Sequence, residues 1–182
     1  MLKTKEILDE KNPILHKKCK DVVFPLNKEC KKLIIDMLEY LEKSQNEEYA
    51  EKHKLRPGMG LAGPQVGIAE RFFVVVHEQE DGTFNKYVIV NPKIISYSEE
   101  FIYAGVGEGC LSVNREVEGI IPRRARITVE AYDIDGNKVK IRAREELAIV
   151  FQHEMDHLNG ILFVDLIDKK NPFKNNDKMR MI

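Results

Sequence analysis

The segment FQHEMDHLNG holds the side chains best suited to hydrolytic chemistry. It contains His153, Glu154 and His157 in the pattern H-E-x-x-H. Residues four apart lie on one face of a helix, so both imidazoles can reach a single metal ion. Glu154 follows the first histidine and can act on a water at that metal without becoming a ligand itself. The pattern therefore predicts a metal-dependent hydrolase.

The alternative for this segment is a helix with two histidines that have unrelated partners. Its flanks are apolar, over 148–151 and 161–163, which predicts that the helix is largely buried. Two histidines and a glutamate buried without a ligand would cost considerable free energy. A metal site is therefore favoured over two unrelated histidines.

A catalytic site of this kind needs a third protein ligand and one open position. One protease class would place its third histidine where this chain has Phe163, and no glutamate follows Glu154. Cys110 is the stronger candidate, because the glycines of GEGCLS allow close backbone approach and a thiolate binds metals well. Its alternative is a small buried hydrophobic residue. Weaker candidates for the third ligand are Asp165, Asp168, His16, His53 and His77.

The spacing of apolar residues predicts the helices and strands that must position these side chains. Residues 27–52 predict a long helix capped by Asn27, and 145–159 predict a second helix that ends before Gly160. Strands are expected over 71–78 and 86–95, and a hairpin over 126–142. The polar tail from Asp168 is expected to be frayed. We therefore expect an α+β fold, with antiparallel sheets packed around a central HExxH-bearing helix and a long N-terminal helix.

The composition limits the class of protein. A chain of 182 residues suits one domain, here 1–182, and a net charge of -1 gives no global reason to expect direct nucleic-acid or membrane binding. The charged start has no signal-peptide core, and we expect a cytoplasmic monomer. Three cysteines in such a chain argue against a disulfide framework, so Cys19 and Cys30 are interpreted as incidental thiols.

Three motifs together resemble the peptide deformylases, whose patterns are GxGLAxPQ, EGCLS and QHExDHLxG. The chain has GMGLAGPQ at 58–65, EGCLS at 108–112 and QHEMDHLNG at 152–160, in that order. The likeness covers roughly 56–166, and SVNREVEG is similar to the type 2 proteins found mainly in Gram-positive bacteria. Two departures are Gly63, where alanine is usual and whose missing methyl would loosen the loop, and Asn114, where many relatives have proline.

The resemblance implies the roles of individual residues. Cys110, His153 and His157 would bind one divalent metal with water in the fourth place; the metal would be Fe²⁺ in the cell, with Zn²⁺, Ni²⁺ or Co²⁺ as substitutes. Glu154 would be the general acid and base. The implied oxyanion donors are Gln65 and the backbone N–H of Leu111, and the implied substrate-binding residues are Met59, Gly60, Gly109, Ile149 and Val150.

The implied reaction removes the formyl group from the N-terminal methionine of nascent peptides and releases formate, with transient ribosome contact. Without the resemblance, Gln65 would be interpreted as a loop residue that binds nearby backbone. Two other functions compete: an ordinary HExxH metallopeptidase, and a non-catalytic binding module stabilised by metal. The third ligand and the release of formate distinguish among the three.

Overall fold

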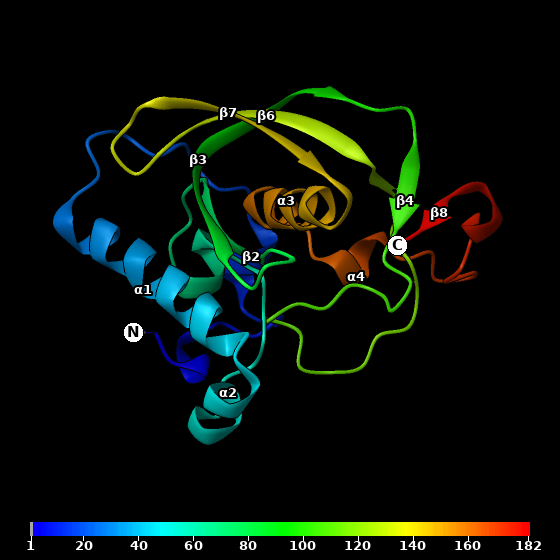
Figure 1. Ribbon diagram of the computed structural model, residues 1–182, viewed down its shortest axis with the longest axis horizontal. Coiled ribbons are helices and arrows are strands. Elements are labelled where there is room, and N and C mark those ends of the chain that lie inside the picture. Colours follow the sequence, from blue (N-terminus) through cyan, green and yellow to red (C-terminus); the bar gives the residue numbers. More distant parts are fainter. Residues whose placement is uncertain (1) are drawn as a thin grey trace.

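The structure is a computed structural model that describes residues 2–182 (Figure 1). Its helices and strands, in chain order, are α1 (Lys28–Ser44), α2 (Glu47–His53), β1 (Gly60–Ala62), β2 (Phe72–Glu78), β3 (Phe84–Tyr97), β4 (Phe101–Tyr103), β5 (Arg123–Arg124), β6 (Arg126–Tyr132), β7 (Lys138–Arg144), α3 (Glu145–Leu158), α4 (Phe163–Leu166) and β8 (Arg180–Met181).

The strands form two sheets. The larger has the order β1-β2-β3-β6-β7 and is antiparallel throughout. The smaller has the order β5-β4-β8, in which β4 and β8 run parallel. The expected α+β class with antiparallel strands is confirmed, and the β4–β8 pair is the exception to it.

Helix α3 lies against the inner face of the larger sheet (Figure 1). Alternate residues of β6, such as Ile127 and Val129, are buried, whereas Arg126 and Glu130 point to solvent. On the helix, the ring of Phe151 packs edge-on against Phe73 and Tyr87, with centroids 5.3 and 5.5 Å away. This packing fixes the helix that carries the two histidines.

The long helix expected over 27–52 is divided in two. Its start is as expected, because the Asn27 side chain accepts a hydrogen bond from the Cys30 backbone N–H at 2.7 Å. The first helix ends at Ser44, and Asn46 caps a second one by accepting from Tyr49 N–H at 2.8 Å. At the break, the Gln45 side chain binds the backbone oxygens of Gly58 and Val76. Across residues 2–182, no helix has the length and apolar character that crossing a bilayer requires.

The expectation of a frayed tail is wrong for its last residues. Strand β8 pairs with β4, and the guanidinium of Arg180 makes a two-pronged ion pair with Glu145 at 2.8 Å and a further one with Glu100 at 2.9 Å. The polar composition of the tail predicts a solvated segment. It gives no sign of the partners of Arg180, because Glu100 and Glu145 lie far away in the sequence. The tail is instead anchored to the first turn of α3.

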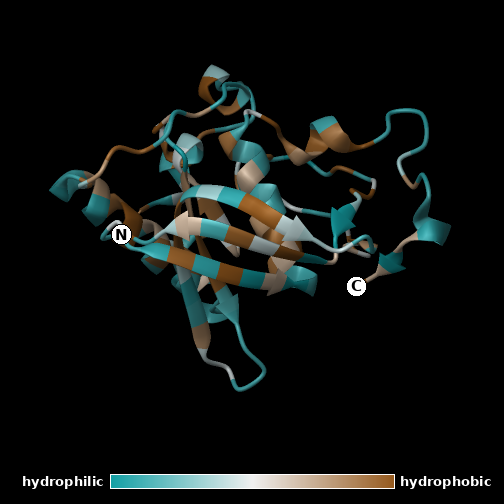
Figure 2. Cartoon of the chain, turned by 90° about the horizontal axis from the view of Figure 1, so that it is seen from above, coloured by the Kyte–Doolittle hydropathy of each residue, from teal (hydrophilic) through white to brown (hydrophobic). Residues whose placement is uncertain are grey.

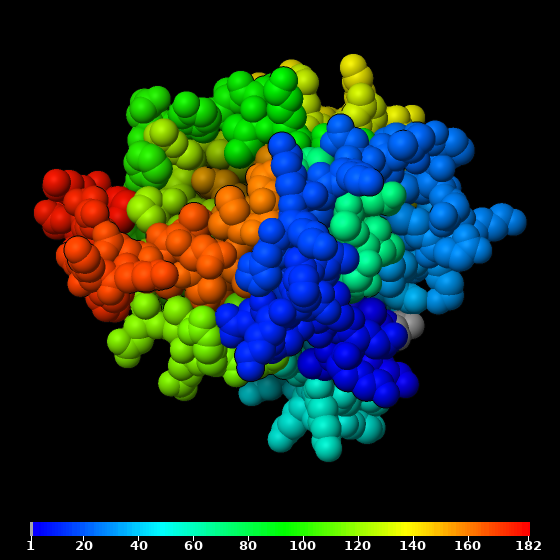
Figure 3. All heavy atoms as spheres, turned by 180° about the vertical axis from the view of Figure 1, so that it is seen from behind, coloured from blue at the N-terminus to red at the C-terminus, as the bar shows by residue number. Residues whose placement is uncertain are grey.

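The N-terminal segment crosses the back of the molecule and reaches the end of α3 (Figure 3). Cys19 N–H donates to the Leu158 carbonyl at 2.9 Å. Gly160 ends the helix with φ of +74°, and a Cβ there would lie 2.8 Å from the backbone of His16 and Lys17. Glycine is needed at this turn both for its conformation and for close contact with the N-terminal segment.

Candidate active site

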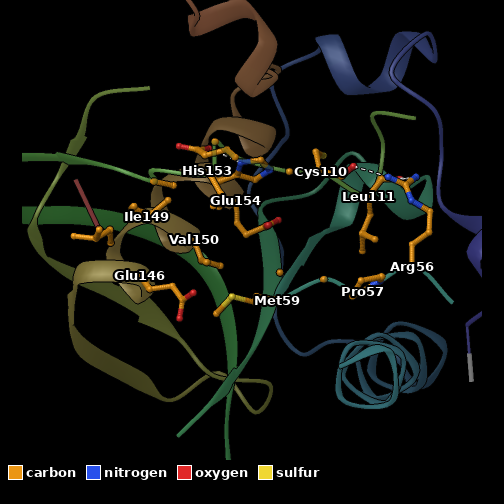
Figure 4. A pocket seen from close by; sticks show the side chains of 18 of the residues that line it. Arg56, Pro57, Met59, Cys110, Leu111, Glu146, Ile149, Val150, His153 and Glu154 are labelled. Atoms are coloured by element: carbon orange, nitrogen blue, oxygen red, sulfur yellow. Dashed lines mark hydrogen bonds and ion pairs between the residues drawn. The ribbon is translucent and has the colours of Figure 1, made fainter. Parts of the chain in front are cut away.

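The three motif segments surround one cavity of about 710 Å³ (Figure 4). Helix α3 forms one wall, and the loops before β1 and after β4 form the others. All but one of the residues to which the resemblance gives a role line it: Met59, Gly60, Gln65, Gly109, Cys110, Leu111, Ile149, Val150, His153 and Glu154. His157 is the exception; it lies buried beside the cavity, 1% exposed.

Cys110, His153 and His157 form a compact set of metal-ligand atoms. One atom from each residue lies within 4.8 Å of the other two, and within residues 2–182 this is the one such group of three found. Cys110 Sγ is 3.3 Å from His157 Nε2. One sulfur and two imidazole nitrogens suit a first-row transition metal such as iron or zinc. The residues present therefore fit a divalent metal ion.

The other candidates for the third ligand are engaged elsewhere. His16 Nε2 lies 2.7 Å from the Glu10 carbonyl, His53 stacks on Tyr49, and His77 faces Glu146 at 3.3 Å. The remaining two, Asp165 and Asp168, accept hydrogen bonds from backbone N–H groups near them in the chain. Among all of the candidates, the structure brings Cys110 alone to the histidine pair.

Arg56 fixes the loop that carries Cys110. Its guanidinium donates to the backbone oxygens of Cys110 at 3.0 Å and Leu111 at 2.9 Å, and to that of Val113 at 3.0 Å. It also contacts the Asn114 side chain. Arg56 was not predicted from the sequence as a functional residue, although it directly precedes Pro57 and the motif at 58–65. Arg56 thus joins the first motif to the second.

We expect Arg56→Met to weaken metal binding about 10- to 100-fold, because residues that orient a metal ligand typically have effects of that size. Methionine keeps the length and apolar stem of the side chain but loses its donors. Titration with Fe²⁺ or Zn²⁺ against a competing chelator measures the change, and thermal unfolding shows whether the fold persists. Arg115→Met, which removes an exposed ion pair with Glu10, is the matched control. Equal metal affinity in the Arg56 variant and the wild type would contradict this role.

A buried group of charges orients His153. Its Nδ1 lies 2.8 Å from a Glu108 oxygen, and Arg123 binds the same carboxylate at 2.7 and 2.9 Å. Arg123 also reaches Asp156 at 2.6 Å. A carboxylate on one ring nitrogen leaves the other nitrogen available to a metal. Sequence reasoning missed Glu108 and Arg123 as functional residues; Glu108 appeared only as a letter of the EGCLS motif.

This charge group makes stability depend on pH. Burial alone would raise the pKa of Glu108, but hydrogen bonds from Arg123 and His153 lower it to about 2. The folded pKa lies below the usual 4.5, so the stabilisation is present above pH 4.5 and is lost as pH falls toward 2. We expect the metal-free protein to lose roughly 3 kcal/mol from this source. Urea unfolding of the wild type and Glu108→Gln across this range tests it; equally steep losses would contradict it.

Glu154 is a buried carboxyl group that lines the cavity. Burial raises its pKa to about 7, and its Oε2 has no hydrogen-bond partner among the described residues. A Cβ at Gly60 would lie 2.7 Å from Glu154 Cδ, so glycine leaves room for the carboxylate in its present position. A buried, unpartnered oxygen of this kind fits a water or substrate group that the cavity admits.

Two candidate donors, the Gln65 side chain and the Leu111 backbone N–H, belong to residues that line the same cavity. The Gln65 Oε1 accepts from Ala62 N–H at 2.8 Å, which holds the amide so that Nε2 lies 3.1 Å from Ser112 Oγ and 3.5 Å from Cys110 Sγ. Gln65 therefore both binds nearby backbone and presents an N–H₂ group beside the cysteine. Within the described part of the chain, no hydrogen bond engages the backbone N–H of Leu111.

Of the backbone groups expected to bind substrate, some already have a hydrogen-bond partner within the protein and others face open space. The Met59 carbonyl already accepts a hydrogen bond from Val76 N–H at 2.8 Å, which extends the pairing of β1 with β2. At Gly109, an added Cβ would meet no atom within 4 Å, so this side of the cavity is open. Ile149 and Val150 contribute an apolar wall from α3 (Figure 4).

The two departures from the family patterns have local explanations. A Cβ at Gly63 would lie 2.7 Å from the Phe72 ring and 3.0 Å from the Ile68 and Glu70 carbonyls, so the missing methyl makes room for a tight turn rather than loosening the loop. Asn114 Nδ2 donates to Asp9 Oδ2 at 2.7 Å, which ties the cysteine loop to the N-terminal segment.

Comparison with known proteins gives one consistent result. The family model described as polypeptide deformylase matches residues 4–173. The chain is 49% identical to peptide deformylase 2 of Bacillus anthracis over 173 residues, which is 95% of this chain and 94% of that protein. It is also 49% identical to the peptide deformylase of Shouchella clausii, over 96% of each chain.

Solved structures agree with the sequence comparisons. The crystal structure of peptide deformylase from Thermotoga maritima superposes with a TM-score of 0.69 and 35% identity, covering 89% of this chain and 96% of that one. The family model spans all three motif segments and the whole of the larger sheet. The chain belongs to the peptide deformylase family.

Proposed function

We propose that this chain hydrolyses the N-formyl group of the N-terminal methionine of nascent polypeptides and releases formate. Removal of that group with the help of a metal is the activity of the family to which it belongs. The observation that carries the proposal is the convergence of Cys110 with the two histidines beside the buried carboxylate of Glu154.

Cys110, His153 and His157 would hold the metal, and we propose ferrous iron in the cell, with zinc, nickel or cobalt as substitutes. The ion would supply a Lewis acid that polarises the formyl carbonyl and brings the pKa of water toward about 7. The fit rests on the donor set and on the carboxylate that fixes the ring of His153.

Glu154 would take the proton of the attacking water and later pass it to the departing amine. A pKa of about 7 suits both transfers at neutral pH. Gln65 Nε2 and the Leu111 N–H would donate to the oxygen that gains negative charge when the formyl carbon becomes tetrahedral. One such donor typically contributes about 10²–10³ to kcat.

The substrate peptide would lie along the cavity as an added strand. Backbone groups of Met59, Gly60 and Gly109 would bind its main chain next to β1. The apolar wall of Ile149 and Val150 would receive the methionine side chain. This arrangement would put the formyl group between the cysteine loop and Glu154.

The remaining parts of the proposal concern the whole chain. Residues 1–182 would act as a single catalytic domain, in which the sheets surround α3 as the central catalytic helix behind the long α1. We propose a monomer that works in the cytoplasm and contacts the ribosome transiently while its substrates emerge.

The test is formate release from formyl-Met-Ala-Ser by protein purified without oxygen and loaded with Fe²⁺, accompanied by metal analysis. We expect one formate and one Met-Ala-Ser per substrate, with no cleavage of internal peptide bonds. Internal cleavage would favour the HExxH metallopeptidase instead. Bound metal without any turnover would favour the non-catalytic binding module.

A further inference from the structure

The outer face of the larger sheet concentrates positive charge. Every second residue of the edge strand β7 is an exposed cation, namely Lys138, Lys140, Arg142 and Arg144. Together with Arg126 of β6 and Lys93 of β3, which are also exposed, these residues form what we call the cationic face. Figure 2 looks onto these three strands.

The strand register places these cations side by side. Arg126 pairs with Arg144 across β6 and β7, while Lys140 and Lys93 flank Glu130 from either side. Glu130 is the single acidic residue among those paired positions. The chain as a whole has a net charge of -1, so this face departs strongly from the average. The net charge of the chain gave no reason to expect a nucleic-acid partner. That sum, however, does not show how the charged residues are distributed over the surface, which depends on the fold.

Much of this charge is not neutralised within the protein. Lys140 lies 3.5 Å from Glu130, and Arg126 lies 3.2 Å from Glu100. In the described chain, Arg142 and Arg144 make no ion pair. The Glu145 carboxyl has a lowered pKa, chiefly because Arg180 donates hydrogen bonds to it. The charges of Arg126 and Arg144 lower that pKa further, so both lie near this carboxylate. Among residues 2–182, however, no direct ion pair holds Arg142 or Arg144, so both guanidinium groups can still meet an external anion.

A shallow hollow lies among the arginines. It has a volume of about 350 Å³, and its lining combines guanidinium with hydroxyl groups: Arg126, Arg142, Arg144, Ser96, Ser98, Thr128 and Tyr97 among others. Ser96, Thr128 and Arg142 are neighbours across β3, β6 and β7. Forked donors and hydroxyls are the groups that bind phosphate and sugar.

We propose that the cationic face binds the phosphate backbone of structured RNA. Cations on alternate residues of β7 repeat about every 7 Å, which is comparable to the spacing of successive phosphates. Charged side chains on an edge strand protect it against aggregation, and this would explain the cations of β7. It does not explain Arg126 and Lys93, which lie on interior strands of the sheet.

The inference rests on the proposed function, because nascent peptides emerge from the ribosome, a particle whose surface is largely RNA. The opposite face of the same strands, including Ile127, Val129 and Ala143, packs with Ala148 and Phe151 of α3. The cationic face and the metal-ligand cluster are thus separated by the sheet and the helix. RNA can therefore bind the cationic face without contacting the metal-ligand cluster.

The test compares two variants that each remove two exposed positive charges. One is Arg142→Gln with Arg144→Gln, and its control is Lys28→Gln with Lys52→Gln on α1 and α2. The probes are a fluorescein-labelled RNA hairpin in anisotropy titrations and vacant 70S ribosomes in co-sedimentation. We expect the arginine variant to bind both probes about tenfold more weakly near 100 mM KCl, with a salt slope reduced by about two. The control should bind as the wild type does.

The outcomes separate this proposal from the deformylase assignment. Formate release from free formyl-Met-Ala-Ser should be unchanged in both variants, since neither pair lines the catalytic cavity. Equal RNA affinity of the arginine variant and the control would overturn the RNA proposal, as would absence of RNA binding by the wild type. Binding to vesicles of phosphatidylglycerol and phosphatidylcholine without RNA binding would assign the face to membrane lipid instead. If the wild type releases no formate, the proposed function is refuted and the RNA proposal is not.

Discussion

Glu154→Gln is expected to lower kcat for formate release by about 10³-fold while the metal content stays at the wild-type level. Glutamine has nearly the same shape as glutamate, so the close packing of this side chain against Gly60 is preserved. It cannot accept the proton of the attacking water. The other carboxylate beside the ligands, Glu108, is already bound by Arg123 and His153. The KM should change little, because Glu154 is not proposed to bind the peptide main chain.

The control for this variant is Glu51→Gln, which removes an exposed carboxylate from α2 and should leave kcat and metal content unchanged. Metal analysis and steady-state kinetics are measured on the same preparations. A Glu154 variant with more than a tenth of wild-type activity would contradict the general-base role. A variant that loses its metal would show that Glu154 supports the ligands rather than the proton transfer.

Local patterns predicted the parts of this site that lie within one element. Helical periodicity alone places His153 and His157 on one face, and the structure has them on α3 with ring centroids 5.0 Å apart. The cap at Asn27 and the turn at Gly160 were predictable for the same reason, since each depends on residues a few positions away.

The parts that could not be predicted depend on contacts between distant segments. Arg56 binds carbonyls more than fifty positions away, and Arg123 joins Glu108 to Asp156 across two different elements. The division between α1 and α2 has a similar cause, because Gln45 leaves the helix to bind Gly58 and Val76. Hydrophobic periodicity continues through such a break and gives no sign of it.

The anchored tail shows how composition can mislead. Residues rich in lysine and asparagine suggest solvated chain, yet Arg180 is held by two carboxylates from separate elements. Net charge misleads in the same way on the cationic face, where alternation along a strand gathers cations that the total conceals. In both places the decisive variable is spatial arrangement, which composition does not contain.

Cys110→Ala is expected to reduce bound metal to about a tenth or less and to abolish formate release. Alanine removes the sulfur that lies 3.3 Å from His157 Nε2, and two imidazoles alone hold a divalent ion poorly. The Arg56 contacts go to backbone oxygens, so they survive the change and the loop should keep its position. Metal analysis after anaerobic purification and the formate assay measure the two effects.

Cys30→Ala is the matched control, because it removes a second buried thiol within α1, and burial raises the pKa of that thiol and disfavours the thiolate. Its metal content and activity should equal those of the wild type. If Cys110→Ala kept full activity, the ligand set would be wrong and another residue would have to complete the site. Loss of metal in Cys110→Ala combined with its retention in Glu154→Gln would separate the two roles, since one residue holds the ion and the other moves the proton.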